Sequence, residues 1–291
     1  MVLLIGGSGY VGQAFHDFLK SKSVPFLSIS RNEIDYYDRT KLAQLIQETK
    51  TTFLINSAGY TGKPNVDACE DHKAETLLGN AVLPGIIREV CEDLKLTWGH
   101  VSSGCIYTGR RPDGNGFTET DPPNFSFRTN NCSFYSGTKA LGEEILEGAE
   151  NCYIWRLRIP FNHIDSPRNY LSKLLKYEYL LEAENSISHL DDFVAACVGT
   201  WENEISPGIY NVTNPGSVTT MQVAELLKQY LVPGHKFKFF KNEDEFMQKA
   251  ARTPRSNCVL DCSKIIQAGI ALRSAEEAII HSLKNWSSNQ N

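Results

Sequence analysis

The chain has 291 residues, of which 41% are hydrophobic and 22% are charged, and its formal net charge is −5. This length and ordinary apolar content exclude global disorder and suit one large domain or two smaller ones. The acidic balance, without a block of Lys or Arg, argues against a nucleic-acid or anionic-membrane partner. No apolar run approaches the roughly 18 residues that span a bilayer. Eight scattered cysteines and seven dispersed histidines form no metal-ligand pattern, so we expect no metal, reduced thiols and a cytoplasmic location.

Short apolar runs alternate with helical patterns through the first half of the chain. The expected strands are Val2–Ile5, Pro25–Ser30, Thr52–Asn56, Leu96–Ser102 and Tyr153–Arg158. The expected helices are Tyr10–Lys20, Thr40–Glu48, Ala74–Leu94 and Tyr135–Gly148, with Pro84 kinking or restarting the third. This alternation predicts a doubly wound α/β domain, with a parallel sheet covered on both faces, over residues 1–158.

Prolines break the second half into shorter pieces. One further strand is expected at Gly208–Thr213, and helices are expected at Met221–Leu231 and Ala275–Leu283. We therefore expect a smaller substrate-binding region formed by residues 159–188 and 214–291. Residues 189–213 are expected to fold back onto the first domain.

A glycine-rich turn with the spacing G-x-x-G-x-x-G joins the first expected strand to the first helix. Such a turn lets the backbone approach a pyrophosphate, and the helix N-terminus supplies amide donors. We assign cofactor binding to Gly6, Gly9, Tyr10, Val11 and Gly12; the alternative is an ordinary glycine-rich connection. The motif G-x-x-x-x-G-K-[ST] is not present, which argues against a P-loop ATPase.

The second strand ends at Ser30 and Arg31, where the ribose of a bound adenosine would lie. NAD sites usually have Asp or Glu at this position, whereas a hydroxyl and a guanidinium suit a 2′-phosphate. We expect NADPH in preference to NADH. The alternative is that Arg31 is a solvated charge and that Glu33 or Asp35 contacts the ribose.

Tyr135 and Lys139 are four residues apart on an expected helix and therefore share one face. Carbonyl reduction needs a proton for the oxygen, and a neighbouring ammonium group would lower the pKa of a tyrosine toward the working range. The pair Tyr37 and Lys41 has the same spacing but follows the second strand, far from the expected nicotinamide. Ser103 ends the fourth strand, on the ligand side of the sheet, where it could share the substrate oxygen with Tyr135.

The glycine turn, Ser103 and the Tyr135/Lys139 pair together resemble the extended short-chain dehydrogenase/reductase family over the whole chain. The resemblance implies that Lys139 also binds the nicotinamide ribose and that Asn80 supports the site; the alternative for Asn80 is helix packing. It also suggests a homodimer.

Further stretches resemble the nucleotide-rhamnose epimerase/reductases, the group that includes the reductase domain of plant rhamnose synthase, and more distantly the dTDP-4-dehydrorhamnose reductases. These stretches are Ala58–Asp67, Ser103–Tyr107, Pro167–Asn169, Asn211–Gly216 and Pro254–Asn257. The closer resemblance implies a nucleotide-sugar substrate, a 4-keto-6-deoxyhexose carried on UDP or dTDP. Ala58 and Gly59 are assigned with it to the cofactor site.

The same resemblance implies a pair of proton-exchanging groups, Cys105 and Lys173. A 4-keto group acidifies the C–H bonds at C3 and C5, and a thiol can serve as acid or base. The alternatives are a buried packing thiol, a surface ammonium, and His163 as a fallback acid/base. Asn169 and Arg255 are assigned to substrate, Arg255 to the pyrophosphate, with a salt bridge as the alternative for Arg255.

These inferences predict an NADPH-dependent 3,5-epimerase/4-reductase that gives a nucleotide-linked L-rhamnose. The alternative within enzymes is a reductase without epimerase activity. A non-catalytic NADP-binding regulator is the alternative of another class, although it would tend to lose the Ser–Tyr–Lys set. A dehydratase or C4-epimerase usually has an acidic residue where this chain has Gly104 and Cys105.

Overall fold

The computed structural model describes residues 1–287, and its centre is a sheet of six parallel strands in the order β10-β5-β4-β3-β1-β2. The strands are β1 (Val2–Ile5), β2 (Phe26–Ile29), β3 (Phe53–Asn56), β4 (Trp98–Ser103), β5 (Cys152–Leu157) and β10 (Gly208–Asn211). Each corresponds to an expected strand within three residues at either end. The predicted doubly wound parallel sheet is confirmed.

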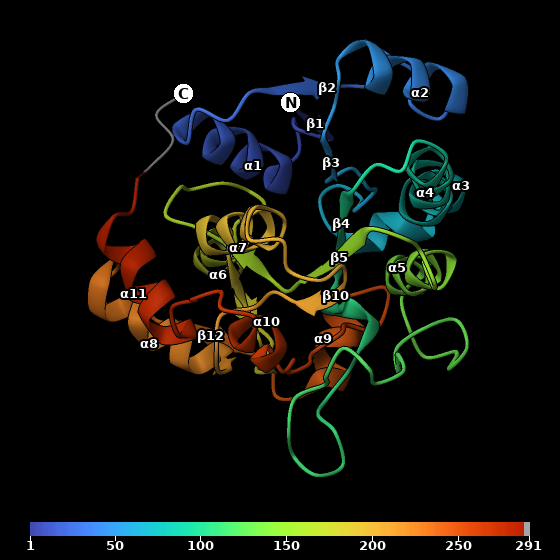
Figure 1. Cartoon of the computed structure of the whole chain (residues 1–291). Helices are drawn as coiled ribbons and strands as arrows, with labels where there is room; N and C mark the ends of the chain where they lie inside the picture. Colours follow the sequence, from blue (N-terminus) through green and yellow to red (C-terminus); the bar gives the residue numbers. More distant parts are fainter. Residues whose placement is uncertain (288–291) are drawn as a thin grey trace.

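The side chains of β1 show how the sheet separates two cores. All four of its residues are buried; Val2 and Leu4 face one core, and Leu3 and Ile5 face the other. The first core is covered by α1 (Tyr10–Ser21) and α7 (Leu190–Glu202), and the second by α2 (Arg39–Glu48) and α4 (Leu83–Asp93). Figure 1 shows α1 and α7 on one side of the sheet and α4 and α5 (Phe134–Ile145) on the other. A parallel sheet needs cover on both faces, which explains the uninterrupted apolar runs in the sequence.

The single helix expected at Ala74–Leu94 is wrong in detail. The structure has α3 (Lys73–Leu77), a π-helical turn η2 (Leu78–Val82) and then α4. Pro84 lies in the first turn of α4, where a residue without an N–H costs no helical hydrogen bond. The wider π turn rotates the intervening side chains, and this rotation turns Asn80 into the protein.

The second region has its own core, in which α6 (Tyr170–Lys176), α8 (Thr220–Tyr230) and α11 (Ala275–Lys284) pack together. Three two-stranded sheets accompany them: β6 (Pro160–Phe161) with β9 (Ser188–His189), β7 (Tyr179–Leu180) with β12 (Lys238–Phe239), and β8 (Glu184–Asn185) with β11 (Val218–Thr219). The remaining elements are α5 (Phe134–Ile145), α9 (Glu243–Lys249), α10 (Ser263–Gln267), and the 3-10 turns η1 (Val66–Glu70) and η3 (Gly104–Ile106).

The two regions exchange segments. Within residues 189–213, α7 packs against α1 and β10 pairs with β5. Cys262, Ile265 and Ile270 also belong to the core of the first region, so the stretch around α10 departs from the expected division. Residues 288–291 of the expected second region lie outside the described residues.

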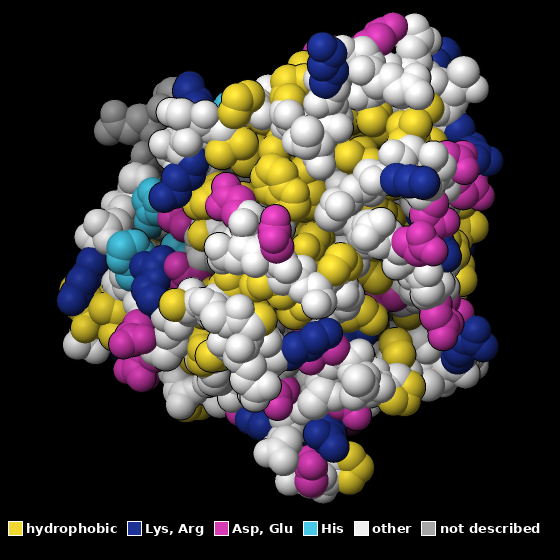
Figure 2. Space-filling view, in the orientation of Figure 1, with side chains coloured by type: hydrophobic (Ala, Val, Ile, Leu, Met, Phe, Trp, Pro, Cys, Tyr) yellow, Lys and Arg dark blue, Asp and Glu magenta, His cyan; other side chains and the backbone are white. Residues whose placement is uncertain are grey.

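Figure 2 shows acidic and basic side chains mixed over the visible face. Across residues 1–287, none of the helices has the length and apolar character that a membrane span requires.

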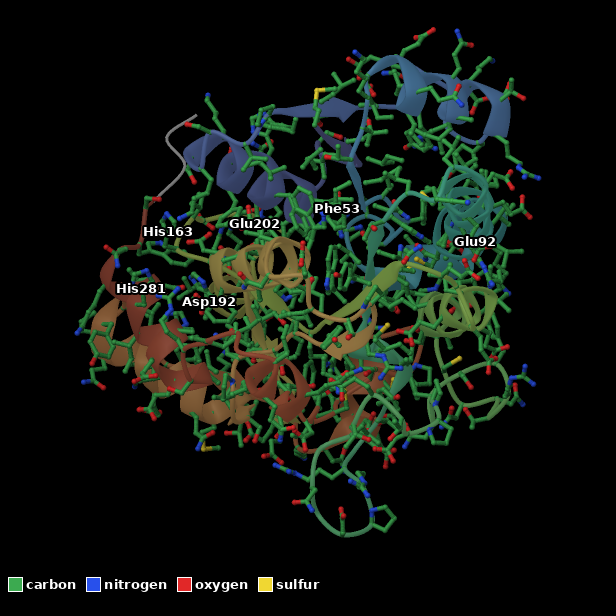
Figure 3. The ribbon with its side chains drawn as sticks, viewed as in Figure 1. Phe53, Glu92, His163, Asp192, Glu202 and His281 are labelled. Carbon is green, nitrogen blue, oxygen red and sulfur yellow. The ribbon has the colours of Figure 1, made fainter. Side chains whose placement is uncertain are left out.

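His189 is a buried histidine at the N-terminus of α7. Its Nδ1 accepts from the backbone N–H of Asp192 (3.4 Å) and from Nη2 of Arg273 (3.2 Å), while Nε2 is buried and has no hydrogen-bond partner among residues 1–287. His281 lies 5.8 Å away between ring centroids. Figure 3 shows His281 and Asp192 together near α7 and α11. Burial lowers the pKa of His189 from 6.5 to about 4.

We predict that this residue makes the fold acid-sensitive. As pH falls from 7 to 5 the unfolded chain protonates this histidine and the folded chain does not, so stability falls, by about 2 kcal/mol for a shift of this size. Urea unfolding at both pH values measures the change. His189→Asn, which keeps a side-chain acceptor for the helix, should lower stability at pH 7 but flatten this dependence. An unchanged difference between the two pH values in the variant would contradict the assignment.

Candidate active site

The three motif glycines serve different purposes. Gly6 has φ +84°, and a Cβ there would lie 2.5 Å from the backbone N of Ala58; a Cβ on Gly12 would lie 2.0 Å from the carbonyl O of Gly6. Both glycines are therefore required by the protein's own packing. A Cβ on Gly9, the N-cap of α1, would meet only the carbonyl O of Gly6 at 3.4 Å. A glycine there leaves the helix N-terminus open, as a dinucleotide pyrophosphate requires.

After the end of β2, the carboxylates of Glu33 and Asp35 accept hydrogen bonds, whereas Arg31 is not paired with a carboxylate among residues 1–287. Glu33 accepts from both the backbone N–H and the hydroxyl of Ser30, each at 2.7 Å, and these bonds lower the pKa of Glu33. Asp35 accepts from the backbone N–H of Tyr37 at 3.1 Å. Arg31 is exposed and has no ion pair within residues 1–287. Glu33 and Asp35, the two carboxylates that could have bound a ribose hydroxyl, thus each accept hydrogen bonds from within the turn.

Asn80 ties together three parts of the site. Its Oδ1 accepts from the N–H of Tyr60 (2.8 Å), and its Nδ2 donates to the carbonyl O of Tyr60 (2.9 Å) and to the hydroxyl of Thr138 (3.1 Å). A Cβ on Gly59 would lie 2.9 Å from the Asn80 Oδ1 and 3.8 Å from the Lys139 Nζ. Asn80 therefore holds the loop after β3 against α5, next to Lys139.

Ser103 and Cys105 meet at the carboxyl end of β4. Ser103 is the N-cap of η3, and its hydroxyl accepts from the backbone N–H of Cys105 at 3.2 Å. The thiol of Cys105 is 6% exposed, and burial raises its pKa, while Ser103, Ser136 and the charges of Arg158 and Lys139 oppose the rise. At neutral pH the group is therefore a protonated thiol.

Tyr135 and Lys139 both project from α5 toward the carboxyl end of β4. The Nζ of Lys139 donates to the carbonyl O of Val101 at 3.1 Å, and burial lowers its pKa. Burial raises the pKa of Tyr135, and a hydrogen bond with Ser103 opposes that rise. From the sequence, a neighbouring ammonium group was expected to lower the pKa of Tyr135. Desolvation outweighs the nearby positive charges, so the phenol is held as an acid.

Glu143 lies one turn beyond Lys139 and forms a buried network that the sequence analysis missed. Its carboxylate accepts from Nη2 of Arg156 at 2.7 Å, from Nε of Arg156 at 3.1 Å, and from the hydroxyl of Ser102 at 2.5 Å. Arg156 is 2% exposed. The spacing Tyr135-Lys139-Glu143, with two arginines in an apolar strand, was the available signal for a buried ion pair.

Lys173 belongs to a second cluster of charged groups. It projects from α6, and burial together with the charges of Arg168 and Arg255 lowers its pKa. Arg168 donates to the carbonyl O of Gly62 at 2.6 Å and its charge also acts on Cys69. A negative charge on Cys105 would raise the pKa of Cys69, so Cys69 lies near both clusters.

Two residues that were expected to bind substrate form hydrogen bonds or a salt bridge with other residues of the protein. Asn169 is fully buried; it accepts from the N–H of Leu171 (3.0 Å) and donates to the carbonyl oxygens of Asn162 and Ile164 (2.8 Å each). Its polar atoms hold the start of α6, and this geometry does not support the expected substrate contact. Arg255 forms a bidentate salt bridge with Asp67, with N···O distances of 2.6 and 2.7 Å.

Three further residues that were expected at the site have the following contacts. Tyr10, at the start of α1, donates to Asn162 Oδ1 at 3.2 Å. Val11 packs against the core that α1 covers. The His163 Nδ1 lies 3.9 Å from Asp191 Oδ2, and Figure 3 places this histidine beside α1 and α11. No group of three or more potential metal ligands occurs within residues 1–287.

Known proteins resemble this chain over most of its length. The family described as the RmlD substrate binding domain matches residues 1–288. The chain is 33% identical over 283 residues to a trifunctional UDP-glucose 4,6-dehydratase/UDP-4-keto-6-deoxy-D-glucose 3,5-epimerase/UDP-4-keto-L-rhamnose-reductase of Arabidopsis thaliana; the match covers 96% of the chain but 41% of that enzyme. It is 32% identical to a bifunctional dTDP-4-dehydrorhamnose 3,5-epimerase/dTDP-4-dehydrorhamnose reductase of the same plant, covering 96% of the chain and 90% of that protein.

A solved structure shares the fold. The L780 UDP-rhamnose synthase of Acanthamoeba polyphaga mimivirus superimposes with a TM-score of 0.89 at 23% identity, covering 98% of this chain and 99% of the other. The structure of an NADP-bound dTDP-4-dehydrorhamnose reductase from Bacillus anthracis has a TM-score of 0.81 at 17% identity and covers 98% of this chain and 97% of the other.

We predict that Glu143→Gln destabilises the protein by about 3 kcal/mol, because it leaves the buried Arg156 without a counter-charge. Glu144→Gln is the matched control: the adjacent residue pairs with Arg128, which is 77% exposed, so the change should be small. Urea unfolding of both variants measures the difference. Equal effects at the two positions would show that the buried pair does not stabilise the fold.

Proposed function

The chain belongs to the RmlD substrate-binding domain family, and we propose that it is an NADPH-dependent 3,5-epimerase/4-reductase of a nucleotide-linked 4-keto-6-deoxyhexose, carried on UDP or dTDP. The observation that carries the proposal is the convergence of Ser103, Cys105, Tyr135 and Lys139 where β4 meets α5. The names of the two plant relatives support the substrate class.

Reduction at C4 would use the first cluster. The nicotinamide, when bound, supplies a hydride to the carbonyl carbon. Tyr135 is held protonated by burial and gives its proton to the C4 oxygen. The hydroxyl of Ser103 shares that oxygen, and Lys139 supplies positive charge beside it. Asn80 keeps the loop after β3 at the distance that this arrangement requires.

Epimerisation would use two groups whose pKa values are shifted in opposite directions. Lys173 has a lowered pKa and can take a proton from C3 or C5 as a neutral amine, so that the C–H electron pair moves to the C4 oxygen as an enolate. Cys105 is a protonated thiol and returns a proton on the opposite face, which leaves a thiolate. Proton transfer through solvent from the Lys173 ammonium to the Cys105 thiolate restores the starting state.

Two narrower functions remain as outcomes of the tests. A reductase without epimerase activity needs Ser103, Tyr135 and Lys139 but neither Cys105 nor Lys173. A cofactor-binding regulator needs the glycine turn alone. The assembled Ser–Tyr–Lys set favours an enzyme, and the buried Cys105 next to Ser103 favours the bifunctional one.

We predict that Cys105→Ser separates the two half-reactions. The hydroxyl is far less acidic than the thiol, so epimerisation should fall by at least roughly 10²-fold, as for loss of a general acid. Reduction of a substrate supplied already epimerised should persist, because Tyr135 and Lys139 are unchanged. NMR detection of deuterium at C3 and C5 in heavy water, together with NADPH absorbance, measures both reactions.

Tyr135→Phe is the complementary variant: reduction should be lost while some deuterium exchange continues. Full exchange at the normal rate in Cys105→Ser would make Cys105 a packing residue and reduce the proposal to a reductase. Failure of the unmodified protein to oxidise NADPH with any keto-sugar nucleotide would favour the regulator.

We predict that Arg31 selects the phosphorylated cofactor. Arg31→Ala should lower kcat/KM for NADPH by about tenfold or more, since a charged hydrogen bond to the 2′-phosphate is lost, and should change the value for NADH little. Arg39→Ala is the control: this arginine is also exposed but pairs with Glu89 and Asp93. An equal loss with both cofactors would show that Arg31 does not contact the 2′-phosphate.

A further inference from the structure

Arg156, in β5, and Arg158, directly after it, are both buried, but within residues 1–287 only Arg156 has a counter-charge. Arg156 pairs with Glu143. Arg158, which directly follows β5 and is 6% exposed, has no carboxylate within 4.0 Å in the described part of the chain. Its Nη2 donates to Oδ1 of Asn185 (2.5 Å) and to the carbonyl O of Ser256, while its Nε is buried without an acceptor. A buried cation with only neutral partners is costly to the fold, so Arg158 is a candidate for a role beyond stability.

The backbone holds this guanidinium in place. Ile159 directly follows Arg158 and has φ +38°, which is strained for a β-branched residue and persists where the surroundings fix the chain. The Arg158 side chain also packs against η3. A Cβ on Gly104 would lie 3.5 Å from Cδ of Arg158, and the carbonyl O of Gly104 accepts from the thiol of Cys258 at 3.2 Å. Arg158 is therefore fixed beside the peptide that leads into Cys105.

The thiol of Cys105 is surrounded by polar and titratable groups from several elements. The groups that act on it or are acted on by it are Ser103 on β4, Tyr135, Ser136 and Lys139 on α5, Arg158 after β5, Cys69 on η1, and Cys132 before α5. Lys139 and Arg158 are the cations that lower the pKa of the thiol. Lys139 is bound to the carbonyl O of Val101 and serves Tyr135 in the proposed reduction. Among the described residues, Arg158 has the neutral hydrogen-bond partners Asn185 and Ser256, and its charge also lowers the pKa of the Cys258 thiol.

We propose that Arg158 is a positioning residue that compensates the negative charge on Cys105 when this thiol gives up its proton. The inference rests on the proposed function, in which the S–H bond of Cys105 breaks, its proton goes to the enolate carbon, and the electron pair stays on sulfur. The guanidinium stabilises that thiolate without touching the substrate, and it takes no proton itself.

Asn185→Asp tests this inference with little change of shape. The new carboxylate at position 185 would form an ion pair with Arg158, whose guanidinium already contacts this side chain. Because the charge of Arg158 would then be compensated by the carboxylate and not by the Cys105 thiolate, we expect the added ion pair to impair catalysis. The pH midpoint for alkylation of Cys105 by iodoacetamide, quantified by peptide mass spectrometry to separate it from the other seven cysteines, should rise by about one unit or more. The pH profile for deuterium exchange should move in the same direction.

Arg158→Met should give the same shift, and Arg158→Lys, which keeps the charge, should stay within about half a unit of the unmodified protein. If Arg158→Met does not fold, Asn185→Asp and Arg158→Lys decide. An unchanged alkylation midpoint in Asn185→Asp, or a shifted midpoint without a shifted exchange profile, overturns the inference. Failure of the proposed function appears separately, as normal exchange in Cys105→Ser.

Discussion

The ion pair between Glu143 and Arg156 is the interaction on which the site depends. It joins α5 to β5 in the protein interior, and the hydroxyl of Ser102 on β4 donates to the same carboxylate. Lys139 and Tyr135 lie one and two turns before Glu143 on α5, so their positions relative to Ser103 follow from this anchor. A buried pair is a weak source of net stability but becomes costly once one partner is missing. The pair thus fixes the register of the helix on the sheet more than it stabilises the chain.

Burial, more than neighbouring charge, sets the chemistry of the site. It raises the pKa of Cys105 and Tyr135 and lowers those of Lys139 and Lys173. Desolvation disfavours whichever form is charged. For the proposed proton exchange on two faces of a substrate, it raises the pKa of the acid Cys105 and lowers that of the base Lys173.

One set of contacts between the two regions lies at η1. Asp67 accepts hydrogen bonds from Arg255 and from the hydroxyl of Thr253, and Asp71 accepts from Arg252. The shortest contact of each arginine is 2.6 Å. These residues join η1 and the segment after it to the stretch before Cys258. Arg255, the residue assigned to the substrate pyrophosphate from the sequence, is paired with Asp67 in this structure.

The sequence alone determined the parallel sheet, the glycine turn and the Ser103, Tyr135 and Lys139 set, because each depends on local periodicity or on spacing within one element. The family resemblance added Cys105 and Lys173. The tertiary structure decided the break of the third helix at η2, since the gain from turning Asn80 inward comes from Tyr60 and Thr138, which are distant in sequence. It likewise decided that Asn169 is a structural residue and that Arg255 has Asp67 as partner. The contrast between Arg156 and Arg158 was equally inaccessible, because a charge is paired or unpaired according to what other strands and loops place beside it.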